Sequence, residues 1–206
     1  TNTPNVLTDD VADLALGLMI TLSRKIVSGH EYTYQKKWRQ KPFNLSQSLT
    51  NKTIGIVGMG AIGKAFSKRA ESLQMNIVYH GPNKKKVKYK YYKNLKQMAQ
   101  AIDIMVITCI GGTSTKNIIN KEIISSLKKS SLIINVSRGS VIDEEYLLHA
   151  LNKKTITGAA LDVFDREPNI NIKFFKLKNI ILSPHNASGT IETRLKMAIM
   201  SRDNLY

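Results

Sequence analysis

The sequence predicts an α/β protein built on a doubly wound parallel sheet. From Lys52 onward, short β-branched runs alternate with helical patterns. The runs are continuously apolar, whereas a strand with one solvent-exposed face would alternate apolar and polar residues. A glycine-rich turn joins the first run to the first helical pattern. Strands that are buried on both faces and connected by helices form parallel sheets, so we predict a Rossmann-type dinucleotide-binding fold.

The expected elements follow in order along the chain. Strands are expected at residues 53–57, 76–80, 104–109, 132–136, 157–163 and 179–182. Helices are expected at about 61–73, 94–101, 121–127 and 143–152, and a closing helix begins at about residue 190. The lysine-rich segment NKKKVKYKYYK, residues 83–93, has low complexity and is assigned no element.

An opening helix precedes this alternation. Thr8 is the predicted N-cap, and Asp9 and Asp10 occupy the first turn. Apolar residues continue to Ile26, so the helix is expected to end near Ser28-Gly29. Because it is apolar nearly all round, we expect it to be buried.

A polar, basic and aromatic segment, residues 30–49, separates the opening helix from the first strand. We interpret it as an excursion that docks against a partner. Three parts are therefore predicted. They are the helix and docking excursion (residues 1–50), the dinucleotide-binding domain (51–186) and a closing helix (187–206).

The composition is that of an ordinary globular protein. The chain has 206 residues, of which 42% are hydrophobic and 22% charged. The single cysteine, Cys109, excludes a disulfide within the chain and fits a reducing compartment, so we expect a cytoplasmic location. The longest apolar stretch, Leu14 to Leu22, is too short to cross a bilayer, and no membrane partner is expected.

The formal net charge of +16 first suggests an acidic partner such as nucleic acid. The basic residues are 24 lysines and 7 arginines, and apart from the cluster in 83–93 they are scattered. Basic and aromatic residues do not interleave as they do in proteins that bind single strands. We therefore predict no nucleic-acid partner, and we assign no metal ligands.

The glycine-rich turn GMGAIG begins at Gly58 and has the G-x-G-x-x-G spacing of dinucleotide-binding folds. Gly58 allows the tight turn, Gly60 lets the backbone approach a pyrophosphate, and Gly63 lets the helix pack against the strand. The first N–H groups of the helix, near Ala61 and Ile62, favour a bound anion. The alternative is a glycine-rich turn that binds no ligand.

The end of the second strand bears on the choice of coenzyme. Folds that bind NAD usually place a carboxylate there, which accepts hydrogen bonds from the ribose hydroxyls. This chain instead has His80, Asn83 and a run of lysines that begins at Lys84. Cations attract a 2′-phosphate, so we predict NADP(H), with these three residues nearest the phosphate. The alternative is a solvated lysine run, which leaves NAD(H) open.

Three reactive side chains follow the carboxyl ends of strands. Arg138 follows the fourth long strand, Glu167 the fifth and His185 the last. An arginine can bind a carboxylate through two hydrogen bonds, a histidine can transfer protons near neutral pH, and a carboxylate can orient the histidine. With a nicotinamide, this set could reduce a 2-oxo acid. Taken singly, each residue could equally be solvated or cap a turn.

Five segments resemble the D-isomer-specific 2-hydroxyacid dehydrogenase family. In chain order they are TNTPNVLTDDVADLALG, GIVGMGAIGKA, NVSRGSVIDEEYLLHAL, GAALDVFDREP and SPHNASGTIETR. Within the family, the resemblance is nearest to the glyoxylate, hydroxypyruvate and hydroxyphenylpyruvate reductases. The implied activity is hydride transfer between NADP(H) or NAD(H) and a small 2-oxo or 2-hydroxy acid.

The resemblance also implies residue roles. Arg138 would hold the substrate carboxylate and carbonyl oxygen, His185 would be the general acid in reduction and the general base in oxidation, and Glu167 would pair with His185. Asp162 would hold the nicotinamide carboxamide. The positions expected to line the coenzyme are Cys109, Ile110, Val136, Ser137 and Ala187. The arginines without such a role are expected to be surface or structural residues, namely Arg69, Arg166 and Arg194.

Two segments depart from the family pattern. Where NADP-dependent relatives often have Ser-Arg-Ser or Asn-Arg-Ser, this chain has Gly81-Pro82-Asn83. Where relatives often have Pro-Leu-Thr, this chain has Ile110-Gly111-Gly112, and we expect a more pliable loop there.

The resemblance implies a full-length chain of some three hundred residues with a separate substrate domain, and that domain is largely missing here. We expect this chain alone to bind coenzyme but to turn over poorly. The opening helix and the segment around Trp38 match the two-fold contact of relatives, so a homodimer is expected. The alternative function is that of a corepressor-type, dinucleotide-sensing interaction protein, although such proteins normally have an acidic residue where this chain has His80.

Overall fold

The computed structural model describes residues 6–204. Seven strands form one sheet in the order β3-β2-β1-β4-β5-β6-β7, and all neighbouring strands are parallel. The strands are β1 (Thr53–Val57), β2 (Asn76–His80), β3 (Lys90–Tyr92), β4 (Ile104–Ile107), β5 (Leu132–Asn135), β6 (Gly158–Leu161) and β7 (Ile180–Leu182). The predicted doubly wound α/β fold is confirmed.

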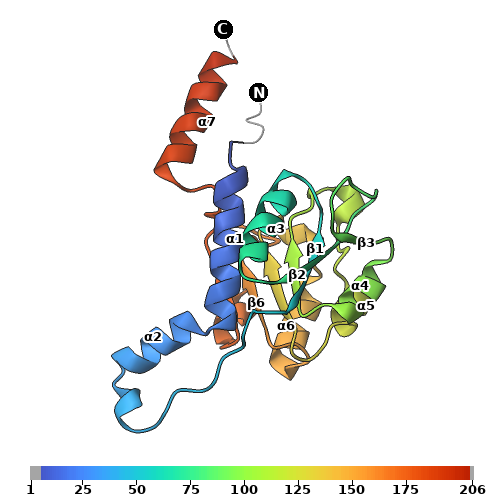
Figure 1. Cartoon of the computed structure of the whole chain (residues 1–206). Helices are drawn as coiled ribbons and strands as arrows, with labels where there is room; N and C mark the ends of the chain where they lie inside the picture. Colours follow the sequence, from blue (N-terminus) through green and yellow to red (C-terminus); the bar gives the residue numbers. More distant parts are fainter. Residues whose placement is uncertain (1–5, 205–206) are drawn as a thin grey trace.

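Helices cover both faces of this sheet (Figure 1). The α-helices are α1 (Thr8–Ser23), α2 (Ile26–Tyr34), α3 (Ala61–Ser72), α4 (Leu95–Ala101), α5 (Lys121–Ser125), α6 (Glu144–Lys153) and α7 (Ile191–Asp203). Short 3-10 helices lie at Lys37–Arg39, Thr113–Thr115, Gly139–Val141 and Ile172–Lys176. None of the helices in residues 6–204 is long and apolar enough to span a membrane.

The core consists of two clusters, one on each face of the sheet. Successive strand residues point to opposite faces, so Ile104 and Val106 belong to the cluster under α1 and α3. Met105 and Ile107 belong to the cluster under α4, α5 and α6. This arrangement explains why the strands read as continuously apolar in the sequence.

The opening helix differs from its prediction. It ends at Ser23, and its N-cap is Leu7 rather than Thr8. Only one face is buried, because Asp13 and Gly17 are exposed. Lys25 then adopts a left-handed conformation (φ 54°), and α2 begins at the next residue.

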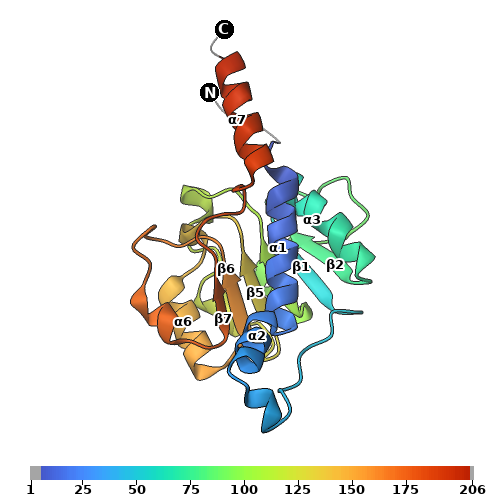
Figure 2. The same cartoon turned by 90° about the vertical axis from the view of Figure 1, so that its left-hand side faces the viewer.

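Contacts with the returning chain explain this break. The Lys25 ammonium donates to the carbonyl oxygen of Leu45 at 2.6 Å, and the Gln47 N–H donates to the carbonyl oxygen of Ser23 at 3.1 Å. These partners are distant in sequence, so the apolar pattern could not reveal them. Figures 1 and 2 show α2 extending from one end of α1 and α7 extending from the other.

The prediction that residues 83–93 contain no element was wrong, because Lys90–Tyr92 form the edge strand β3. A three-residue edge strand that carries lysine has no apolar pattern to detect. β4 and β6 are also shorter than predicted, since residues 108–109 and 162–163 already belong to the loops beyond the sheet. These loops build the candidate site.

Candidate active site

A cleft of about 720 Å³ lies beyond the carboxyl ends of the central strands. Parallel strands deliver their loops to one edge, which is where open α/β sheets bind ligands. The predicted site residues that line this cleft are Ile62, Cys109, Ile110, Val136, Ser137, Arg138, Asp162, His185 and Ala187. These residues come from the loops after four strands, β4, β5, β6 and β7, and from the first turn of α3.

The glycine turn has the geometry that its sequence predicted. Gly58 has a φ of +101°, and a Cβ atom there would lie 2.5 Å from the Cα of Cys109. A Cβ atom at Gly63 would lie 2.4 Å from the carbonyl oxygen of Gly58. Both positions therefore exclude a side chain.

Gly60 differs from the other two glycines, since a Cβ atom there would meet nothing within 4 Å. It precedes α3, and it has no side chain to cap the N–H groups of Ala61 and Ile62. These donors and the positive end of the helix dipole suit an anion. The open space and the donors fit the pyrophosphate of a dinucleotide.

His80 lies beside the glycine turn, because its carbonyl oxygen accepts from the Gly58 N–H at 2.9 Å. Its Nδ1 lies 2.9 Å from the carbonyl oxygen of Tyr92. A carbonyl oxygen only accepts, so Nδ1 carries a proton and Nε2 is the free ring nitrogen. The edge strand β3, which the sequence did not predict, therefore orients this histidine.

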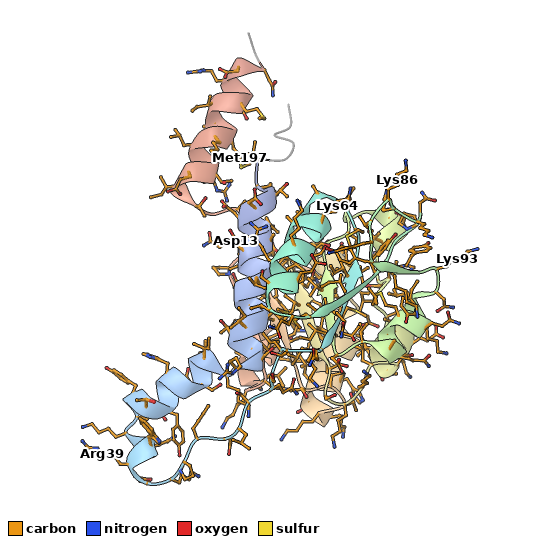
Figure 3. The ribbon with its side chains drawn as sticks, in the orientation of Figure 1. Asp13, Arg39, Lys64, Lys86, Lys93 and Met197 are labelled. Atoms are coloured by element: carbon orange, nitrogen blue, oxygen red, sulfur yellow. The ribbon has the colours of Figure 1, made fainter. Side chains whose placement is uncertain are left out.

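The lysine loop after β2 is fixed by a buried tyrosine. The hydroxyl of Tyr79 accepts from the backbone N–H of Lys85 at 2.8 Å, and Tyr79 itself is fully buried. Asn83, Lys84 and Lys86 are exposed. Figure 3 shows Lys86 on the outside of the molecule, toward the β3 side. The loop therefore exposes these cations to solvent.

Glu167 and His185 are in direct contact. Glu167 Oε2 lies 2.5 Å from His185 Nδ1, and Glu167 Oε1 accepts from the Phe164 N–H at 2.8 Å. One carboxylate oxygen thus anchors the side chain, and the other holds the imidazole. Since a carboxylate accepts, Nδ1 carries the proton, and Nε2 remains free for proton exchange.

Arg138 lines the same cleft as His185 and is exposed to it. Its Nη1 donates to the carbonyl oxygen of Ser137 at 2.7 Å. The buried side chain of Asn135 fixes this loop, because its Nδ2 donates to the Arg138 carbonyl oxygen and its Oδ1 accepts from the Ser137 N–H. The remaining guanidinium donors can bind a carboxylate.

Asp162 is fully buried, and its carboxylate accepts hydrogen bonds from the loop that carries His185.

Cys109 is partly buried, and its burial raises the pKa of the thiol. The thiol therefore stays protonated near neutral pH, which does not suit a nucleophile.

Several cleft residues escaped the sequence prediction. They are Leu7, Val11, Thr108, Gly111, Ser188, Arg194 and Met197. Thr108 donates to the carbonyl oxygen of Gly58 at 2.8 Å and so fixes the glycine turn. A Cβ atom at Gly111 would lie 2.5 Å from the Cγ of Arg138, so this departure from the family pattern makes room for the arginine.

Two of the arginines without a predicted role differ in their surroundings. Arg69 bonds Asp9 and Asp13, which joins α3 to α1, so its structural role is confirmed. Arg194 lies on α7 and lines the cleft. The expectation of a surface or structural role for Arg194 did not include this place in the cleft. This place depends on the return of the chain to α1, where Thr190 Oγ1 donates to Asp10 Oδ2 at 2.5 Å, and that long-range contact has no sequence signal.

A parallel sheet, a glycine turn at a helix N-terminus and a carboxylate-histidine pair at the same edge define a dinucleotide-binding protein of the dehydrogenase class. The family profile "D-isomer specific 2-hydroxyacid dehydrogenase, NAD binding domain" matches residues 16–187. The chain belongs to this family.

Similar proteins agree with this assignment. Glyoxylate/hydroxypyruvate reductase A (HPR2) of Arabidopsis thaliana and hydroxyphenylpyruvate reductase of Plectranthus scutellarioides are each 42% identical over 206 residues. All of this chain matches, but it covers only 66% of either protein. Among solved structures, the NADPH-dependent glyoxylate/hydroxypyruvate reductase of Sinorhizobium meliloti in complex with NADP and malonate superposes with a TM-score of 0.95 at 38% identity, and the chain covers 65% of it.

Proposed function

We propose that this chain binds NADP(H) and forms the coenzyme-binding part of an oxidoreductase that reduces small 2-oxo acids, such as glyoxylate or hydroxypyruvate, to D-2-hydroxy acids. The observation that carries the proposal is the 2.5 Å contact between Glu167 and His185, because His185 lines the same cleft as Arg138. The names of the similar reductases support the substrate class.

The residues of the cleft fit the coenzyme. The glycine turn and the first turn of α3 would hold the pyrophosphate, and Asp162 would hold the nicotinamide carboxamide. The walls of the site would come from Cys109, Ile110, Val136, Ser137 and Ala187. When bound, the coenzyme supplies the hydride.

The side chains of this protein bind the acid and move the proton. Arg138 binds the substrate carboxylate and orients the carbonyl group toward His185. His185 donates a proton to the carbonyl oxygen, and Glu167 stabilises the imidazolium before the transfer. A well-placed donor to such a developing oxyanion typically contributes about 3 to 4 kcal/mol to catalysis.

The preference for NADP(H) rests on charge at the end of β2. His80, Asn83 and Lys84 stand where a carboxylate would repel a 2′-phosphate. The ion pairs within residues 6–204 do not involve Lys84, Lys85 or Lys86, so these cations are available to a phosphate.

Fluorescence titration of the chain with NADPH and with NADH tests the proposal. We expect NADPH to bind more tightly, and the double substitution Lys84→Gln/Lys86→Gln to weaken NADPH binding about tenfold while leaving NADH unchanged. The control Lys129→Gln/Lys153→Gln makes the same charge change at a distant surface. If both double variants weaken NADPH binding equally, the effect comes from net charge and not from a contact with Lys84 or Lys86. If neither NADPH nor NADH binds to the unchanged chain, the proposed function is refuted.

We also propose a homodimer in the cytoplasm. The arm formed by α2 and residues 35–49 exposes large apolar side chains, including Tyr34 (81% exposed), Trp38 (68%) and Leu45 (92%). Apolar surface of this kind indicates a protein contact. Sedimentation equilibrium should give twice the chain mass of 23.1 kDa, and a monomer at all concentrations would contradict the dimer.

A further inference from the structure

Within residues 6–204, the hydrogen bonds that the Asp162 side chain accepts all come from one short segment. Oδ1 accepts from the hydroxyl of Ser183 and from the Asn186 N–H at 2.8 Å. Oδ2 accepts from the Ala187 N–H at 3.0 Å. The donors lie on either side of His185, so the carboxylate spans the loop that presents the imidazole.

His185 itself has a backbone conformation that needs such support. Its φ is +51°, which is uncommon for a residue with a side chain. Its N–H donates to the carbonyl oxygen of Ser183 at 3.0 Å, so the chain turns tightly at this point. A conformation of this kind persists only where the surroundings fix it, and it is typical of functional sites.

Charge explains why a carboxylate suits this position. Asp162 is fully buried, and the ion pairs of residues 6–204 provide it with no cation. The three donors of the 183–187 segment therefore solvate it, and hydrogen bonds to an ionised group are the stronger kind. An asparagine would direct its amide N–H₂ toward one of these donors, so one contact would become repulsive.

We infer that Asp162 is a positioning residue for His185, because its carboxylate holds the 183–187 segment in the conformation that places Nδ1 of His185 against Glu167. This inference deepens the proposed function and rests on it for the consequence in turnover. Asp162 holds the 183–187 segment even when no coenzyme is bound. This positioning role differs from the proposed contact between Asp162 and the nicotinamide carboxamide, which requires the coenzyme.

NMR of the isotope-labelled chain without coenzyme tests the positioning. We expect a downfield proton resonance from His185 Nδ1 held by Glu167, which Glu167→Gln assigns by removing it. In Asp162→Asn, this resonance should disappear. Amide exchange of Asn186 and Ala187 should accelerate roughly tenfold to a hundredfold, as the loss of hydrogen bonds to a charged group predicts.

Two further variants make the test decisive. Ser183→Ala keeps the carboxylate and removes one donor, so we expect a smaller acceleration of the same amides, and this variant tests the inference even if Asp162→Asn does not fold. Ser131→Ala removes a buried hydroxyl that donates to the carbonyl oxygen of Ile102 at 3.4 Å, outside the cleft, and it should change neither readout. An unchanged resonance and unchanged exchange in both Asp162→Asn and Ser183→Ala would overturn the inference.

NADPH titration of the same variants separates the two proposals. If Asp162→Asn weakens NADPH binding and leaves the His185 resonance intact, Asp162 contacts the coenzyme only, and the positioning role is wrong. If NADPH does not bind to the unchanged chain while Asp162→Asn still releases His185, the proposed function fails and the positioning role stands.

Discussion

The two sides of the cleft are built in opposite ways. The glycine turn offers backbone N–H groups, and two of its positions have no room for a Cβ atom. The side that carries Arg138 and His185 depends on side chains, which buried polar residues such as Asn135 and Asp162 hold in place. Binding and chemistry should therefore respond to different substitutions.

The largest effect is expected at His185. Turnover can be measured in a chimera in which this chain replaces the matching segment of the Arabidopsis reductase, which supplies the remaining third of that protein. His185→Gln should lower kcat by roughly 10²–10⁴-fold, because the proton donor is lost. The NADPH dissociation constant should stay within about twofold of its original value. A variant with full activity would remove His185 from the mechanism.

The second-largest loss of activity is expected for Arg138→Ala. Loss of a guanidinium that binds a carboxylate should lower kcat/KM by about 10²–10³-fold, mainly through KM. Arg166→Ala is the matched control, since it removes an exposed guanidinium outside the cleft. An unchanged kcat/KM in Arg138→Ala would place the substrate carboxylate elsewhere.

A substitution in the glycine turn should weaken coenzyme binding, whereas the substitutions at His185 and Arg138 should affect turnover and substrate binding. In Gly63→Ala, the new methyl group would meet the Gly58 carbonyl oxygen, so the turn must shift, and NADPH should bind at least about tenfold more weakly. Gly60→Ala faces open space in the free chain and should leave its thermal stability unchanged. If Gly63→Ala bound NADPH normally, the turn would not be the pyrophosphate site.

The smallest effect concerns the opposite edge of the sheet, where Asp103 precedes β4. Burial raises the pKa of Asp103, but the Thr53 N–H and the Lys128 ammonium outweigh it, and the net shift is downward from 3.8. A lowered pKa in the folded state stabilises the protein above pH 3.8 and loses that contribution as the pH falls through the lower value.

Asp103→Asn should therefore lower the free energy of unfolding at pH 7 by about 1 kcal/mol and flatten its dependence on pH between about 5 and 2. Denaturant unfolding at several pH values measures this. NADPH binding at pH 7 should not change, because Asp103 lies far from the cleft. An equal acid dependence in both proteins would show that this carboxylate does not contribute.

The difference between the glycine turn and the side chains that support His185 also explains which parts of the site the sequence could predict. Each glycine of the turn and each of Arg138, Glu167 and His185 follows a strong apolar strand, so topology alone places them at one edge. The hydrogen bonds that Asp162 accepts depend on the path of the 183–187 segment. Most of their donors are backbone N–H groups, which have no sequence signature. Arg194 and β3 escaped for similar reasons, since long-range return of the chain decides where they lie.

A crystal structure of the chain soaked with NADPH tests the proposed coenzyme site. We expect the pyrophosphate to lie against the N–H groups that follow Gly60 and the nicotinamide ring to lie beside His185 and Arg138. An empty cleft, or a coenzyme bound with its nicotinamide away from these two side chains, would contradict the proposed function.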